Sequence, residues 1–222
     1  MRIAGVDDAG RGSVIGPLVI AGVLIEKENL HRLVNLGVKD SKLLSPHKRE
    51  RLAKEIRKTA LLCHFIALST SEIDKVVETG RKLRRLNHLE ARTMAEVIAV
   101  LKPDIAYVDA SDVLAERFKQ QILENLSFEV QIVSEHKADA KYPIVSAGSI
   151  IAKVERDKAI QELREKHGDF GSGYITDPKT IVFLKECIRK FGTYPEFVRK
   201  SWKPAKRIKK NMKNKQTKLL DC

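Results

Sequence analysis

Apolar residues near the start of the chain fall into short runs bounded by polar turns. The first run covers residues 3–6 and leads into Asp7-Asp8, and similar β-rich runs cover residues 18–25 and 61–68. Short runs of this kind, rich in Val, Ile and Leu and bounded by turn residues, are typical of buried strands. The pattern therefore predicts a strand over each of these segments, the first of which ends in a pair of acids.

Helix signals separate the strands. Ser45 before Pro46 marks the start of a basic amphipathic helix. Asn87 and Glu90 predict a capping box that opens a second helix, and Pro103 lies beyond its end. Strands and helices alternate in this part of the chain, which indicates an α/β protein.

The middle of the chain continues the alternation. Residues 105–109 predict a short buried strand that, like the first one, ends in an acid, Asp109. Ser111 and Asp112 are expected to cap the helix that follows. Residues 128–133 predict the next strand. The order of elements here is strand, helix, strand.

The last part of the chain is expected to be helical. Small and apolar residues occupy both faces of the segment 144–153, which predicts a helix buried in the middle of the protein, with Asp139 near its start. Gly168 closes this helix, and the glycine-rich segment after it presents one aromatic ring, Tyr174. Pro178 begins another helix.

Charge points to a polyanionic partner. The 222 residues include 42 Lys and Arg against 29 Asp and Glu, a net charge of +13, and such an excess favours nucleic acid. From Arg199 onward the chain holds ten basic residues and the single acid Asp221. We expect this tail, which also carries Trp202, to act as an electrostatic arm for nucleic acid.

Composition also excludes several classes of protein. No apolar run is long enough to span a bilayer, and the N-terminus lacks the layout of a secretory signal. The three cysteines are distant in sequence and form no Cys-x-x-Cys pair, which argues against a disulfide framework or a zinc knuckle. We therefore expect a cytoplasmic protein with no membrane partner.

Four acids are the candidates for a catalytic metal site. Asp7, Asp109 and Asp139 each close a predicted strand or open the element after one, and Asp8 adjoins the first. Carboxylates converge if the first strand lies beside the strand ending at Asp109, and such a set favours Mg²⁺ or Mn²⁺. Two such ions roughly 4 Å apart can activate water against a phosphodiester. The alternative is structural, with acids that end strands in polar turns or cap helices.

Five segments, in this order and spacing, closely resemble ribonuclease HII, the type 2 ribonuclease H, in its archaeal form. They are residues 7–12 (DDAGRG), 39–42 (KDSK), 107–109 (YVD), 136–157 (HKAD to IAKVERD) and 171–178 (GSGY to DP). The match runs through about Trp202. Any one segment alone is weak, but together they are specific.

The resemblance implies the fold. It predicts a ribonuclease H-like α/β architecture, with a mixed five-stranded sheet flanked by helices, the first three strands antiparallel, and a small helical C-terminal part. We expect a catalytic domain over residues 1–195 and a basic helical segment and tail over residues 196–222.

The resemblance also implies the activity and the residues that carry it. The family cuts the RNA strand of RNA/DNA hybrids and the 5′ side of single ribonucleotides embedded in duplex DNA, leaving 3′-hydroxyl and 5′-phosphate ends. This activity would remove misincorporated ribonucleotides and RNA primers. By position, the catalytic metal ligands for Mg²⁺ or Mn²⁺ would be Asp7, Asp8, Asp109 and Asp139. The substrate-binding residues would be Gly10, Arg11 and Gly12 at the ribose 2′-hydroxyl and adjoining phosphates, Lys42 at a phosphate, and Tyr174 stacked at the RNA-to-DNA junction.

Two features depart from the family pattern. The second acid is normally glutamate, and Asp8 draws its carboxylate back by roughly 1.5 Å. This predicts weaker activity, a preference for manganese or a compensating backbone shift. At the C-terminus, Gln216 and Leu219 fit the clamp-binding peptide of some archaeal relatives, but the chain stops at Asp221-Cys222 without the aromatic anchors. A sliding clamp contact therefore stays open, and we expect a monomer.

Two other functions compete with this interpretation. One is another nuclease of the same fold, such as a resolvase or transposase core, which would not need the Gly10-Arg11-Gly12 turn together with Tyr174. The other is a basic nucleic acid-binding protein whose acids hold a structural ion or cap helices. It would bind without cleaving.

Overall fold

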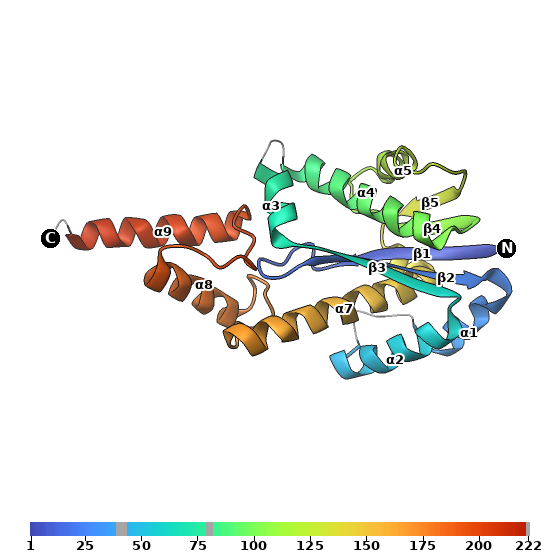
Figure 1. Ribbon diagram of the computed structural model, residues 1–222, viewed down its shortest axis with the longest axis horizontal. Helices are drawn as coiled ribbons and strands as arrows, with labels where there is room; N and C mark the ends of the chain where they lie inside the picture. The colour runs from blue at the N-terminus through green and yellow to red at the C-terminus, as the bar shows by residue number, and fades with distance from the viewer. Residues whose placement is uncertain (39–43, 79–81, 221–222) are drawn as a thin grey trace.

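A mixed five-stranded sheet forms the centre of the protein, which is described here by a computed structural model covering residues 1–38, 44–78 and 82–220 (Figure 1). The strand order is β3-β2-β1-β4-β5. The strands are β1 (Arg2–Ala9), β2 (Leu18–Glu26), β3 (Leu62–Leu68), β4 (Ile105–Asp109) and β5 (Gln131–Glu135). The first three strands pair antiparallel, whereas β4 runs parallel to both β1 and β5. The predicted sheet is confirmed.

Helices cover both faces of the sheet and extend beyond one end of it (Figure 1). They are α1 (Leu30–Asn35), preceded by a short 3-10 turn η1 (Lys27–Asn29), α2 (Pro46–Thr59), α3 (Thr70–Glu78), α4 (Lys82–Leu101), α5 (Ala115–Leu123), α6 (Ala138–Lys141), α7 (Pro143–His167), α8 (Pro178–Phe191) and α9 (Lys203–Leu220). α4 and α5 pack on one face of the sheet, and α7 with α2 packs on the other.

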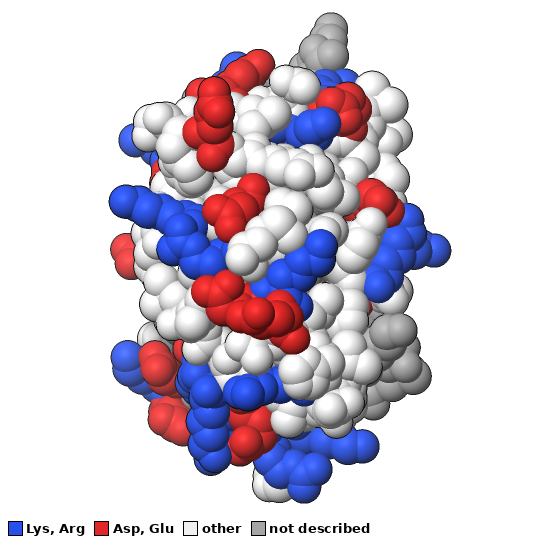
Figure 2. Space-filling view, turned by 90° about the vertical axis from the view of Figure 1, so that its right-hand side faces the viewer, with Lys and Arg blue, Asp and Glu red and all other residues white. Residues whose placement is uncertain are grey.

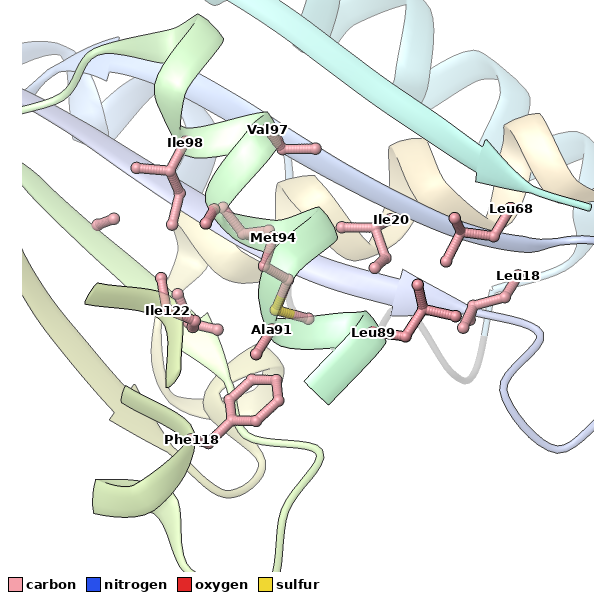
Figure 3. Close-up of a cluster of buried hydrophobic side chains, with 14 of the residues drawn as sticks. Leu18, Ile20, Leu68, Leu89, Ala91, Met94, Val97, Ile98, Phe118 and Ile122 are labelled. Carbon is pink, nitrogen blue, oxygen red and sulfur yellow. The ribbon is translucent and has the colours of Figure 1, made fainter. Parts of the chain in front are cut away.

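β1 is buried on both faces, which explains its continuous apolar sequence. Ala4 and Val6 point to the α4 side, into a cluster that includes Met94 and Ile98. Figure 3 shows Met94 and Ile98 of α4 in that cluster, close to the strands. Ile3 points the other way, into the cluster formed with α7. The period-two alternation of a strand thus serves two cores at once.

α7 approaches β1 closely because both elements carry glycine at the contact. A Cβ atom at Gly5 would lie 2.2 Å from the carbonyl carbon of Ile144, and one at Gly148 would lie 2.8 Å from the carbonyl oxygen of Gly5. Both distances are far below a van der Waals contact. These glycines therefore set how near the helix comes to the strand that ends in Asp7 and Asp8.

A third apolar cluster joins the C-terminal part to the loop after β1. It contains Val14 and Ile15 of that loop together with residues of α7, α8 and α9. Ile15 also forms an isolated antiparallel bridge with Val198. The predicted division at residue 195 falls inside this cluster, between Tyr194 and Val198.

Two predicted helix starts are wrong. α4 begins at Lys82, so Asn87 and Glu90 lie inside it, and their side chains bond Arg11 instead of forming a capping box. α5 begins after Leu114, with no side-chain cap. Asp112 accepts a hydrogen bond from the backbone N–H of Leu114 at 2.9 Å, just ahead of the helix.

Two other boundaries shift. The last strand spans Gln131–Glu135, later than the expected 128–133. The predicted buried helix is divided into α6, which holds Asp139, and α7. The break falls at Tyr142, which adopts an extended conformation because Pro143 follows it. The expected helix start at Pro178 is confirmed, with Asp177 as its N-cap.

Surface charge differs between the ends of the molecule. The end at which β1 begins carries basic and acidic side chains side by side (Figure 2). The exposed basic residues after Val198 lie beyond the opposite end, on the segment that includes α9 (Figure 1). None of the helices in residues 1–38, 44–78 and 82–220 has the length and apolarity needed to cross a membrane.

The contact between β1 and α7 gives a stability prediction. Gly5→Ala should lower the free energy of unfolding by about 3 kcal/mol or more, because the new methyl group meets backbone atoms that cannot yield. Gly22→Ala on β2 is the matched control. Its methyl group meets the ends of the Leu101 and Val97 side chains, which can shift, and it should cost about 1 kcal/mol. Urea unfolding of both variants tests this order, and equal losses would contradict it.

Candidate active site

Asp7 and Asp109 lie side by side at one edge of the sheet. β1 and β4 are parallel, with Val6 opposite Val108, so the next residue on each strand is an aspartate. Parallel strands bring their carboxyl ends to the same edge, and in open α/β sheets this edge is the usual place for a ligand. The first strand therefore lies beside the strand that ends at Asp109, which is the condition for the two carboxylates to converge.

Asp7 and Asp8 face opposite sides of the sheet because successive strand residues alternate. Asp7 is 5% exposed and lies on the α7 side, where the side chain of Ser149 hydrogen-bonds to it. Asp8 lies on the other side and accepts a hydrogen bond of 3.2 Å from the hydroxyl of Ser111. The two acids thus flank the end of β1.

Asp139 lies beside Asp109. The Oδ1 atom of Asp109 accepts a 2.8 Å hydrogen bond from the backbone N–H of Ala138, the first residue of α6. Asp139 follows directly and is 6% exposed. Each of the four predicted ligands therefore belongs to an element that ends or begins at this edge of the sheet.

Burial and mutual repulsion destabilise the charged forms of these acids. Burial raises the pKa of Asp7 well above its usual range, and the charges of Asp8 and Asp109 raise it further. Burial also raises the pKa of Asp8, against the opposing influence of Arg11. A cation at this edge would relieve both costs, so the donor set fits a hard, oxygen-preferring ion.

The acids are not yet gathered around one point. Within residues 1–38, 44–78 and 82–220, no three acidic, histidine or cysteine side chains are arranged closely enough to hold an ion.

The Gly10-Arg11-Gly12 turn follows β1 and borders a cleft of about 390 Å³. Gly10 has φ +91°, and a Cβ atom there would lie 2.5 Å from Nε of Arg156. Only glycine fits this conformation in this space. The cleft is also lined by Asp8, Lys153, Arg49, Asp157 and Tyr174. One hollow thus joins an acid, the glycine turn and the predicted stacking ring.

Tyr174 is held against the turn by backbone bonds from the neighbouring residue. The carbonyl oxygen of Gly173 accepts hydrogen bonds from the N–H groups of Val14 and Ile15, at 2.8 and 3.1 Å. The guanidinium carbon of Arg156 lies 4.7 Å from the centre of the Tyr174 ring. The predicted substrate-binding residues Gly10, Arg11, Gly12 and Tyr174 are therefore brought together, whereas Lys42 lies outside the described residues.

Arg11 points into the protein. Its Nε donates to Oε1 of Glu90 at 2.8 Å, and its Nη2 donates to Oδ1 of Asn87 at 2.6 Å. Asn87 in turn donates to Oδ2 of Asp112 at 2.9 Å, and Arg117 donates to the same carboxylate. Two of the three guanidinium nitrogens of Arg11 are thereby engaged by α4.

Glu90 is a buried acid that sequence reasoning treated as a helix cap. Burial raises its pKa to about 8, and the charge of Asp8 adds to this, while Arg11 opposes it. A signal was present, because Asn87, Glu90 and Thr93 recur every third residue on the buried side of a helix. A polar stripe in an apolar setting points to a bonded partner elsewhere in the chain.

Arg199 corrects the prediction of a continuous basic arm. Its side chain is fully buried; Nε donates to the carbonyl of Gly16 at 3.1 Å, and Nη1 donates to that of Arg11 at 3.0 Å. Burial lowers its pKa to about 10. Arg199 therefore binds the loop after β1 and adds nothing to the exposed charge of the tail. Its sequence neighbourhood, which is basic throughout, gives no sign of this.

Comparison with known proteins gives consistent matches. The sequence model of the family described as Ribonuclease HII matches residues 4–205. The chain is 46% identical to Ribonuclease HII of Pyrococcus abyssi over 221 residues, which cover 99% of this chain and 96% of that protein. It is also 46% identical to Ribonuclease HII of Methanosarcina barkeri, over 96% of this chain and 97% of the relative.

Solved structures agree with this. The ribonuclease H2 from Pyrococcus horikoshii superposes with a TM-score of 0.88 at 42% identity, covering 96% of this chain and 99% of the other. The RNase HII in the PCNA:RNase HII complex from Archaeoglobus fulgidus superposes with a TM-score of 0.82 at 47% identity, covering 91% of this chain and 96% of the other. Bst-RNase HIII in complex with Mn²⁺ superposes with a TM-score of 0.80 at 20% identity, covering 96% of this chain and 71% of the other, and it shares the fold.

The bonds around Asp112 predict a pH dependence of stability. Burial alone would raise its pKa, but hydrogen bonds from Arg117, Leu114 and Asn87 prevail and lower it to about 2 from 3.8. A lowered acid pKa stabilises the folded state above about pH 4, and this contribution is lost as the pH falls toward 2. Between pH 4 and pH 2, the free energy of unfolding of the wild type should therefore fall by about 2 kcal/mol more than that of Asp112→Asn.

Urea unfolding at several pH values measures this difference, with Glu124→Gln, an exposed acid just after α5, as control. The control should follow the wild type. Parallel curves for the wild type and Asp112→Asn would refute the assignment.

Proposed function

Because the chain belongs to the ribonuclease HII family, we propose that it cuts nucleic acid on the 5′ side of ribonucleotides, including single ribonucleotides embedded in duplex DNA. The chain is a ribonuclease H, a hydrolase that acts as an endonuclease on RNA/DNA hybrids. One feature of the structure supports cleavage beside a single ribose above all others. The cleft that contains Asp8 is also lined by the Gly10-Arg11-Gly12 turn and by Tyr174.

Asp7, Asp8, Asp109 and Asp139 are the residues that we propose hold the divalent metal. Their support is the register that places Asp7 beside Asp109, and the hydrogen bond that ties Asp109 to the start of α6. Burial is the main cause of the raised pKa values of Asp7 and Asp8, and a bound cation would offset this cost of burying their charged forms. A bound Mg²⁺ or Mn²⁺ pair would supply an activated water and stabilise the leaving oxygen.

Recognition of the ribose is assigned to the main chain of the Gly10-Arg11-Gly12 turn. The absence of side chains at Gly10 and Gly12 allows a sugar to approach the backbone closely. The 2′-hydroxyl both donates and accepts hydrogen bonds, and backbone N–H and C=O groups can satisfy it in both roles. Tyr174, across the same cleft, offers its ring for stacking at the junction between RNA and DNA.

Basic residues in the cleft support the binding of the phosphate backbone. Lys153 and Arg156 extend from α7 and Arg49 extends from α2. Arg49 is oriented by Asp157, whose Oδ2 accepts a 2.7 Å hydrogen bond from its Nη2. These positive charges would hold the duplex beside the acids. With a suitable cation bound, the site would be complementary to a scissile phosphodiester.

A sliding clamp is a possible further partner. The related chain from Archaeoglobus fulgidus was solved as a PCNA:RNase HII complex. Gln216 and Leu219 of this chain fit two positions of the clamp-binding peptide of some archaeal relatives. Aromatic anchors usually dominate the energy of such small interfaces, and neither of these two positions supplies one.

A duplex with one ribonucleotide tests the proposed function. With Mg²⁺ or Mn²⁺ the protein should make a single nick 5′ to the ribose, leaving a 3′-hydroxyl and a 5′-phosphate, and should leave the all-DNA duplex intact. Asp109→Asn should lower the nicking rate by about 10³-fold or more while duplex binding persists, because it weakens the acid set without touching the glycine turn. Binding by the wild type without a nick would overturn the proposal.

Asp8 gives a second test. Asp8→Glu restores the length normal in the family and moves the carboxylate outward by roughly 1.5 Å. We expect the Mg²⁺-supported rate to rise several-fold and the ratio of manganese to magnesium activity to fall. Ser111→Ala, which removes the hydrogen-bond donor to Asp8, serves as the comparison that alters Asp8 without changing its length. An unchanged rate and metal preference in Asp8→Glu would show that this position does not limit activity.

A further inference from the structure

Arg11 is held at both ends. Glu90 and Asn87 of α4 accept hydrogen bonds from its guanidinium group, at 2.8 and 2.6 Å. Arg199 donates to its backbone carbonyl oxygen at 3.0 Å. The central residue of the glycine turn is thus fixed by partners that lie far from it in the sequence, on α4 and in the segment before α9.

The two main partners of Arg11, Glu90 and Arg199, are deeply buried. The Glu90 side chain and Arg199 are both 0% exposed, whereas the side chain of Arg11 itself is 34% exposed. Burying ionisable side chains such as these is costly, and a buried bonded pair of this kind is weak evidence for stability. The protein keeps these residues where apolar side chains could fill the same volume. What these two side chains add, and apolar side chains could not, is directed hydrogen bonds to the turn and to the loop that follows it.

The bonds of Arg199 span the whole loop after β1. Its guanidinium group reaches the carbonyl of Arg11 at the beginning and that of Gly16 at the end. Between these points, the carbonyl of Gly10 accepts hydrogen bonds from the backbone N–H and the hydroxyl of Ser13, at 3.2 and 2.9 Å. Few alternative shapes remain open to a loop tied at both ends and in the middle.

We propose that Glu90 and Arg199 are positioning residues for ribose recognition, holding Arg11 so that the backbone of Gly10 and Gly12 is presented to the sugar. This inference rests on the proposed role of the turn in recognising the 2′-hydroxyl. Arg11 acts through the position it gives to its neighbours. Because Glu90 and Asn87 anchor its side chain, we assign it this positioning role in place of the direct phosphate contact expected from the sequence.

The role should show most clearly on a substrate with a single ribose. In a continuous RNA/DNA hybrid every nucleotide offers a 2′-hydroxyl, so a displaced turn still finds one in some register. In a duplex with one ribonucleotide only one register is productive, and small displacements reduce the rate strongly. The ratio of the two rates therefore reports positioning, which a general loss of stability would not change.

Glu90→Leu removes the acceptor with little change in volume. It should lower kcat on the single-ribonucleotide duplex about tenfold more than kcat on the continuous hybrid, with a small change in KM. Glu90→Gln keeps an acceptor for Arg11 and should stay within about threefold of the wild type on both substrates. The matched control is Glu96→Leu, an exposed acid on α4 paired with Arg92. It should leave the ratio unchanged.

Arg11→Met separates the two roles of this arginine. If Arg11 acts through Glu90, three variants should have the same ratio of the rate on the single-ribonucleotide duplex to the rate on the continuous hybrid. These are Glu90→Leu, Arg11→Met and the double variant, because each of them removes the same hydrogen bond between Arg11 and Glu90. If Arg11 binds a phosphate directly, Arg11→Met lowers the rates on both substrates and Glu90→Leu leaves the ratio unchanged. That second pattern would overturn the positioning role.

Two further measurements separate a failure of the positioning role from a failure to fold and from a failure of the proposed function. Asn87→Ala removes one of the two anchors and should shift the ratio by a smaller factor, which provides the measurement if Glu90→Leu does not fold in a thermal melt. A wild type that does not nick at the ribonucleotide would refute the proposed function. A wild type that nicks, with an unchanged ratio in the folded variant, would refute only the positioning inference.

Discussion

The close approach of α7 to β1 is the constraint on which the site depends. Gly5 and Gly148 let helix and strand backbones meet where no side chain fits. This seats β1 at the centre of the sheet, buried on both faces. The position of β1 in turn determines where the acids at its end, the turn that follows it and the paired strand β4 lie. A protein interior transmits small shifts because it is close-packed, so the backbone at the edge that carries the acids is positioned by the core below it.

Rules of local sequence predicted the strands that end in acids, whereas the mixed sheet that arranges them was implied by the resemblance to the family. Strands that end in Asp7 and Asp109 can be identified from apolar runs, and parallel pairing then brings these residues together. The same rules failed at Glu90 and Arg199. An acid near a helix start is read as a cap, and an arginine in a basic segment is read as surface charge, because local patterns contain no information about distant partners. Arg11 is the shared partner of both, and only the folded chain shows this.

Charge in this protein has two separate uses. The end of the molecule where β1 begins mixes both signs on its surface (Figure 2). Around the cleft, by contrast, Lys153 and Arg156 line a hollow that also contains Asp8. Positive groups there attract a phosphate backbone, whereas the acids disfavour it until a cation neutralises them. Binding of the metal and binding of the nucleic acid should therefore favour each other, since each relieves the repulsion that the other meets.

The anchoring of Arg11 bears on what the site can distinguish. An arginine free in the cleft could form paired hydrogen bonds to a base or a phosphate. With its guanidinium group engaged by Glu90 and Asn87, the turn presents mainly backbone groups. Backbone N–H and C=O groups can recognise a sugar hydroxyl but are indifferent to which base the sugar carries. A sensor built in this way would detect a ribose in any sequence, and its selectivity would come from the shape of the turn. The hydrogen bonds that the buried side chains of Glu90 and Arg199 form with Arg11 are the proposed means by which the fold maintains that shape.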